Sequence, residues 1–147
     1  MRPLEHPIPN TCFMSCVKII GQDLWFDLDI LAFIDLFSDI CHENSVRGAF
    51  HVRRENLKTI SGVMGFRADF LFDLGLPLES EYLGDSRVLL SFHRFQDTDL
   101  HAHCLVFIGV ADDSRLRVIC PSKNDYNFIP SGIFTKWQCN PVLIRAA

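Results

Sequence analysis

The chain has 147 residues, of which 48% are hydrophobic and 22% are charged, and its formal net charge is -4 at pH 7. This length and composition predict a single globular domain over residues 1–147, with enough apolar side chains for a buried core. The acidic balance, with no basic run longer than Arg53 and Arg54, argues against nucleic acid or a membrane surface as a partner.

No segment is apolar over a length that would span a bilayer, and the first residues lack the apolar core of a secretory signal. We therefore expect a cytoplasmic protein, or one that is exported without a cleavable signal. Its six cysteines are expected to be reduced thiols rather than disulfides. Cys104 and Cys120 lie in apolar runs and are expected to be small buried residues.

The first half of the chain predicts helices. Pro3, Pro7 and Pro9 indicate an extended start over residues 1–10. Apolar residues at helical spacing then predict helices over residues 12–20, 28–41 and 55–64. Thr11 is the expected N-cap of the first helix and Gly21 its end, and Gly65 is the expected end of the third helix.

The second half of the chain predicts strands. Apolar and alternating runs indicate strands over residues 66–72, 87–93, 104–110, 116–120 and 142–145, with a short helical piece over residues 131–138. Residues 75–85 are expected to form a loop, and residues 95–99 a turn. Helices followed by strands predict an α+β fold in which N-terminal helices pack on a C-terminal antiparallel sheet.

Cys12 and His103 are the candidate catalytic residues. Cys12 is predicted at the start of the first helix, and His103 at the start of an apolar strand. A helix N-terminus stabilises a thiolate, and an adjacent imidazolium stabilises it further. If the sheet packs against this end of the helix, the two residues would form a nucleophile and its base.

Five short segments support this interpretation by resemblance. Residues 11–21 begin with Thr-Cys and end in Gly, residues 57–66 end in Met-Gly-Phe, and residues 103–109 place apolar residues and a Gly after His. Residues 117–121 end in Cys-Pro, and residues 134–137 include two aromatic side chains. In this order they resemble the bacteriocin-processing, or double-glycine, peptidases, which are papain-like cysteine proteases. The resemblance implies a papain-like fold and a cysteine-dependent hydrolase.

The chain departs from that family around the site. Cys120 stands where the family has Asp before Pro, and the family's upstream Gln, an oxyanion donor, is missing. Asn10 or a backbone amide would have to replace that Gln. A third group normally fixes the imidazole tautomer. For His103 the candidates are Asn124 and Asp125, with Cys120 as a poor substitute; Asn fills this role in papain-like proteases.

Structural roles compete with these catalytic ones. Cys12 and His103 would then be packed residues with satisfied polar groups, and Cys16 is expected in the core in either case. His101 and His103 share a strand face, which would allow a metal ion. Two ligands do not make a site, so we expect no metal.

The remaining histidines and tryptophans carry no motif. His42, His51 and His93 are expected on the surface or in loops. Trp25 and Trp137 are expected in the core or along a groove.

Two functions from different classes stay open. The first is a cysteine-dependent amide hydrolase, a protease or a glutamine deamidase, which acts on a peptide or protein substrate without a cofactor. The second is a catalytically degenerate peptidase-like domain that binds an extended peptide or protein partner. The missing Asp and Gln favour the second function. The presence of both Cys12 and His103 favours the first, because an inactive copy has no chemical reason to keep both.

Overall fold

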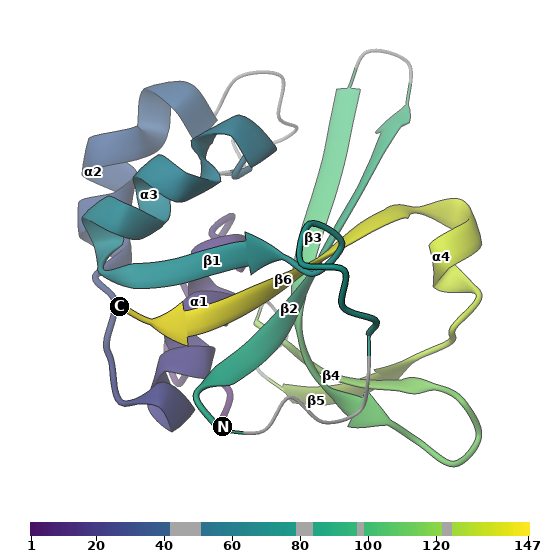
Figure 1. Cartoon of the computed structure of the whole chain (residues 1–147). Helices are drawn as coiled ribbons and strands as arrows, with labels where there is room; N and C mark the ends of the chain where they lie inside the picture. Colours follow the sequence, from purple (N-terminus) through teal and green to yellow (C-terminus); the bar gives the residue numbers. More distant parts are fainter. Residues whose placement is uncertain (42–50, 79–83, 97–98, 122–124) are drawn as a thin grey trace.

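Three N-terminal helices come before the strands, which form one antiparallel sheet (Figure 1). The computed structural model describes residues 1–41, 51–78, 84–96, 99–121 and 125–147. The helical elements are α1 (Cys12–Leu24), α2 (Ile30–Cys41), the 3-10 turn η2 (Arg54–Asn56), α3 (Leu57–Met64) and α4 (Ile133–Lys136). The strands are β1 (Phe66–Phe70), β2 (Ser86–Gln96), β3 (Asp99–Val110), β4 (Leu116–Cys120), β5 (Asp125–Ile129) and β6 (Gln138–Ala146). The predicted α+β layout is confirmed, whereas its papain-like identity stays a prediction.

The last strand of the chain is inserted between the first two. The strand order is β1-β6-β2-β3-β4-β5, and Figure 1 shows β6, in yellow, running between β1 and β2. Strand β3, which carries His103, therefore lies inside the sheet between β2 and β4. Helix α1 packs against β2, β3 and β6. Helix α1 and strand β3, which carries His103, thus meet on one face of the sheet.

The two faces of the sheet bury alternate residues of each strand. Leu89 and Val106 face the helices, where they pack with residues of α1. Leu90 and Leu105, their chain neighbours, belong to a second apolar cluster. This division follows from the two-residue period of a strand. The clusters hold the sheet rigid between them, which fixes the residues that β3 presents to α1.

Helix α1 is longer than the sequence predicts. It continues through Gly21 to Leu24 and ends at Trp25, which adopts a left-handed conformation with φ 62°. Gly21 does not end the helix. Its missing side chain lets the Phe26 carbonyl oxygen approach the helix closely, because a Cβ at this position would lie 2.3 Å from that oxygen. The expectation that Trp25 is buried is also wrong, since its side chain is 95% exposed.

The other boundaries of helices and strands differ from the predicted ones mainly where strands pair. Helix α3 and its left-handed terminator Gly65 (φ 85°) confirm the prediction for that segment. The turn predicted over residues 95–99 is wrong in part, because β2 extends to Gln96 and pairs there with Asp99 of β3. Strand β5 was not predicted, and β6 begins at Gln138 rather than at residue 142. Backbone hydrogen bonding to a neighbouring strand continues through these polar stretches.

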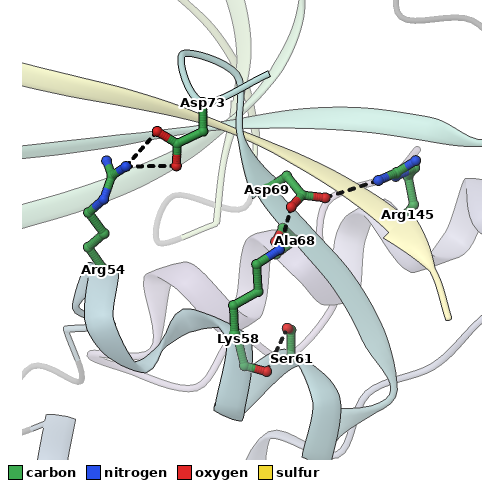
Figure 2. A network of polar contacts seen from close by, with 7 residues as sticks. All are labelled: Arg54, Lys58, Ser61, Ala68, Asp69, Asp73 and Arg145. Atoms are coloured by element: carbon green, nitrogen blue, oxygen red, sulfur yellow. Dashed lines mark hydrogen bonds and ion pairs between the residues drawn. The ribbon is translucent and has the colours of Figure 1, made fainter. Parts of the chain in front are cut away.

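A network of charged side chains joins α3 to β1 and β6 (Figure 2). Lys58 donates to the Ala68 carbonyl oxygen at 3.0 Å and also pairs with Asp69. Arg145 of β6 donates to the other oxygen of Asp69 at 3.0 Å. These contacts, with Lys58 as the largest cause, lower the pKa of Asp69. Asp69 thus connects a helix and two strands through one carboxylate.

In the described part of the chain, no helix is both long enough and apolar enough to cross a membrane.

Candidate active site

Cys12 is the first residue of α1. The helix is anchored directly behind it, because Phe13, Met14 and Cys16 are buried. Cys12 itself is only partly buried. A side chain at this position lies beside the main-chain N–H groups of the first helical turn, which have no partner within the helix. These groups favour negative charge on the sulfur.

Thr11 occupies the N-cap position, as predicted, but its side chain makes no capping hydrogen bond. Its hydroxyl group donates to the Ile8 carbonyl oxygen at 2.7 Å and lies 2.9 Å from the Ser15 hydroxyl oxygen. Thr11 is almost completely buried. The side chain therefore fixes the segment that precedes the helix and leaves the first N–H groups of α1 uncapped by Thr11.

His103 lies on β3 opposite Phe92 of β2. His103 and Cys12 line the same cavity, and each acts on the pKa of the other, so the structure brings the two predicted catalytic residues together. The Nε2 atom of His103 lies 3.4 Å from the Cys120 sulfur. The imidazole ring is thus held between the start of α1 and the end of β4.

The surroundings of Cys12 favour its thiolate. Its pKa is held well below the usual value, first by a hydrogen-bonding interaction with the Cys104 side chain, against the opposing effect of burial. Hydrogen bonding and positive charge from His103 lower it further. The Cys104 thiol correspondingly has its pKa raised well above the usual value, by Cys12 and by burial. Cys104 therefore stays protonated and can donate to the Cys12 sulfur.

The surroundings of His103 favour the imidazolium. Hydrogen bonding to Cys12 and then to Cys120 raises the pKa of His103 to about 9, although burial acts in the opposite direction. The lowered pKa of Cys12 and the raised pKa of His103 both favour the state in which the ring holds the proton and the sulfur carries the negative charge. This is the ionisation state that a cysteine nucleophile needs.

A cavity of about 370 Å³ opens directly at this pair. Three parts of the chain line it. The segment around the start of α1 contributes Pro7, Ile8, Pro9, Asn10, Thr11, Cys12 and Ser15, strand β3 contributes Ala102 and His103, and Pro121 follows β4. Asn10, the predicted oxyanion donor, is therefore present in the wall, where its backbone adopts a left-handed conformation with φ 63°.

The side chain of Cys120, one of the three candidates for orienting His103, contacts the ring. Asn124 lies outside the described residues. Asp125 begins β5, and its Cα pairs with that of Cys120. The least favoured sequence candidate thus holds the position in which the resembling family has an Asp.

Several polar residues around Cys12 were missed. His51 is half-buried, and its ring centroid lies 6.5 Å from that of His93. Burial and the charge of His93 lower the pKa of His51, and Cys12 acts on it in the opposite direction. His51 lies in a loop, as expected, whereas His93 belongs to β2 and is half-buried. No local pattern signals them, because His51 reaches the site from outside the sheet.

Among the residues that the structure describes, no third His, Cys, Asp or Glu joins His101 and His103 in a group that could hold a metal ion. Across the described ranges, no group of three His, Cys, Asp or Glu residues is arranged to hold a metal ion.

Neither the protein-family models nor the curated proteins include a match to this chain. Its function is therefore inferred from the geometry of the site.

Proposed function

We propose that this protein is a cysteine-dependent amide hydrolase, a protease or a glutamine deamidase, in which Cys12 is the nucleophile and His103 is the general base and acid. The observation that carries the proposal is the contact between Cys12, at a helix N-terminus, and His103, at the wall of an open cavity. Nucleophile, base and access for a substrate are the three parts that this chemistry requires.

The reaction would proceed in two halves. The Cys12 thiolate attacks the carbonyl carbon of the amide, and the imidazolium of His103 gives its proton to the leaving nitrogen as the C–N bond breaks. A thioester to Cys12 results. His103, now neutral, takes a proton from water as the water attacks the thioester, and the carboxylic acid leaves. The resting ion pair is then restored.

The negative oxygen that develops during attack needs hydrogen-bond donors near the Cys12 sulfur. The first main-chain N–H groups of α1 are suitable, because the Thr11 side chain does not cap them. Asn10 lines the same cavity two residues earlier and is the side-chain candidate. A backbone donor together with Asn10 would replace the Gln of the resembling peptidases.

The lining of the cavity suits a peptide substrate. Pro7 and Pro9 come from the segment before α1, Ala102 comes from β3 and Pro121 follows β4, so stiff and apolar residues lie in the same cavity as Cys12. A peptide strand, or a glutamine side chain on a protein surface, would present its carbonyl carbon to Cys12 there. Release of an amine or of ammonia follows from the same steps.

A second function has one observation in its favour. Cys120, rather than a carboxylate, contacts Nε2 of His103. A neutral thiol is a weaker hydrogen-bond acceptor than a carboxylate and orients the ring less firmly. A domain that keeps the groove and binds an extended peptide without turnover is therefore the alternative.

The test is the alkylation rate of each cysteine against pH, followed by mass spectrometry. The wild type is compared with His103→Ala, and His101→Ala is the matched control because it alters the same strand two residues away. Cys41 and Cys139 serve as internal references, because burial raises their pKa values to about 11 and about 12. Circular dichroism of each variant verifies the fold.

We expect Cys12 to react fast at pH 6 in the wild type and in His101→Ala, and slowly in His103→Ala. In a second step, Cys12→Ala should abolish hydrolysis of extended peptides or glutamine-containing proteins, while Cys139→Ala should leave it intact. If Cys12 titrates as an ordinary thiol near pKa ~8.5 in all folded variants, the hydrolase proposal is wrong. Fast alkylation with peptide binding but without turnover would favour the binding domain.

A further inference from the structure

Four of the six cysteines gather around the candidate site. Cys12 and Cys16 lie one turn apart on α1, Cys104 follows His103 on β3, and Cys120 contacts His103. None of the four forms a disulfide bond within the described part of the chain. The hydrolase reaction uses Cys12 as nucleophile and Cys120 as a contact of the ring, which leaves Cys104 and Cys16 without a chemical role.

Cys12 and Cys104 form an unequal pair. Cys12 lines the cavity and is partly exposed, so a small reagent can reach its sulfur. Cys104 is only 3% exposed and belongs to the apolar cluster against which Cys12 packs. The Cys104 thiol is also the largest cause of the lowered pKa of Cys12, so the two side chains lie close enough to interact. A reagent in the cavity therefore reaches Cys12 first, and the Cys104 thiol lies behind Cys12.

Cys16 is a poorer partner for Cys12. Both residues are on α1, four positions apart. Cβ atoms at this helical spacing are roughly 5–6 Å apart, whereas a disulfide needs a Cβ separation of about 3.5–4.5 Å. Joining them would distort the helix. Cys104 comes from a different element, so its approach to Cys12 does not depend on helical geometry.

We propose that Cys12 is a site of reversible oxidation by hydroperoxides and that Cys104 is the thiol that resolves the oxidised form into a Cys12–Cys104 disulfide. The proposal rests on the Cys12 thiolate that the proposed function also uses. It adds a modification, and thereby a regulation, to the same residue.

The chemistry balances in two steps. The Cys12 thiolate attacks one oxygen of the hydroperoxide, the O–O bond breaks, and the leaving alkoxide or hydroxide takes a proton from the medium. Sulfur is oxidised by two electrons to a sulfenic acid, and the peroxide is reduced to an alcohol or water. The Cys104 sulfur then attacks the Cys12 sulfur, the S–O bond breaks, and the hydroxide leaves as water with the Cys104 proton.

The disulfide would stop hydrolysis without destroying the nucleophile. A sulfenic acid that finds no thiol is oxidised further to a sulfinic acid, which ordinary thiols do not reverse. A disulfide is returned to two thiols by an external dithiol through exchange. Cys104 thus protects Cys12 while the amide hydrolase is switched off.

The test treats the full chain with hydrogen peroxide, blocks the remaining thiols by alkylation and maps the peptides by mass spectrometry. We expect the wild type to yield a peptide that joins Cys12 to Cys104 and loses this link with dithiothreitol. In Cys104→Ser, Cys12 should instead be trapped as sulfenic acid by dimedone, or be found as sulfinic acid. Ser91 interacts with Cys104 by hydrogen bonding, so a hydroxyl at position 104 has a polar neighbour. Cys139→Ser, which changes a thiol of the other apolar cluster, is the matched control and should still form the link.

The outcomes separate this proposal from the proposed function. Fast alkylation of Cys12 at pH 6 with direct conversion to sulfinic acid in the wild type would overturn the role of Cys104 alone. A dominant link from Cys12 to Cys16, to Cys120 or to a second chain would overturn it as well. The link with no hydrolysis of any amide would support the modification and contradict the hydrolase. The wild-type map decides this even if Cys104→Ser does not fold.

Discussion

The Nε2 atom of His103 lies 3.4 Å from the sulfur of Cys120, at the end of the neighbouring strand. The two groups can share a hydrogen bond whose direction depends on the tautomer of the ring, and this contact orients the imidazole. Cys120 is 5% exposed, so water does not compete strongly for this contact. A thiol makes a weaker hydrogen bond than a carboxylate.

Replacing Cys120 should change the reactivity of Cys12 in two directions. Cys120→Ala removes the acceptor, and we expect the alkylation rate of Cys12 at pH 6 to fall about 2- to 10-fold, as for the loss of a hydrogen bond worth ~0.5–1.5 kcal/mol. Cys120→Asp supplies a carboxylate and should raise the pKa of His103 and the rate of hydrolysis. Cys139→Ala is the control. An unchanged rate in folded Cys120→Ala would show that the contact does not position the ring.

The pH dependence of His103 gives a second prediction. Its pKa is raised to about 9 in the folded protein, first by Cys12, whereas the unfolded chain has the ordinary value near 6.5. The contribution of the protonated ring to folding stability is therefore complete below about pH 6.5 and is lost as the pH rises through about 9. A carbon-13 NMR titration of the histidine rings should place His103 near the upper value in the wild type and lower in Cys12→Ala. Equal titration curves in the two proteins would contradict the ion pair.

Local sequence patterns correctly predicted the helices and strands whose sequence signals lie within their own residues. Helix α3, with Gly65 behind it, and strand β4 are examples. Strand β5 and the far ends of β2 and β3 were missed, because their hydrogen bonds are made to strands that no local pattern specifies.

Prediction of the site from the sequence is limited in the same way. Cys12 was predicted at a helix start, and α1 begins there. His103 was predicted at a strand start, whereas β3 already begins at Asp99. Neighbouring residues of a strand point to opposite faces, so an interaction of Cys12 with both His103 and Cys104 was not predictable from the sequence. The interaction of Cys12 with both residues depends on where α1 begins relative to β3. The contact between His103 and Cys120 depends likewise on the pairing of β3 with β4.

The charged network around Asp69 should stabilise the fold in a pH-dependent way. Its carboxylate, 21% exposed, pairs with both Lys58 and Arg145. Asp69→Asn should lower the free energy of unfolding at pH 7 by about 1 kcal/mol, the upper range for an exposed ion pair. Because the folded pKa is depressed, this difference is present above the unfolded pKa near ~4 and disappears as the pH falls below it. Urea unfolding at a series of pH values measures it.

Asp73→Asn is the matched control for that experiment. Asp73 pairs only with Arg54 among these cations, at 2.5 and 2.7 Å, and its side chain is 53% exposed (Figure 2). We expect a smaller loss than for Asp69→Asn, since solvent screens the pair more strongly. A loss that is equal for both variants, or one for Asp69→Asn that persists in acid, would mean that Asp69 does not act through its charge.

Two helical glycines should respond to alanine with opposite sign. At Gly21 an added Cβ would lie 2.3 Å from the Phe26 carbonyl oxygen, so the chain after α1 must shift. At Gly62 of α3 an added Cβ meets nothing within 4 Å. Gly62→Ala should stabilise the protein by about 0.5–1 kcal/mol through lower backbone entropy in the unfolded chain. Gly21→Ala should destabilise it by ~1–3 kcal/mol, the range for overpacking. Chemical unfolding of the two variants measures both changes, and a stabilised Gly21→Ala would show that residue 21 is an ordinary helical position.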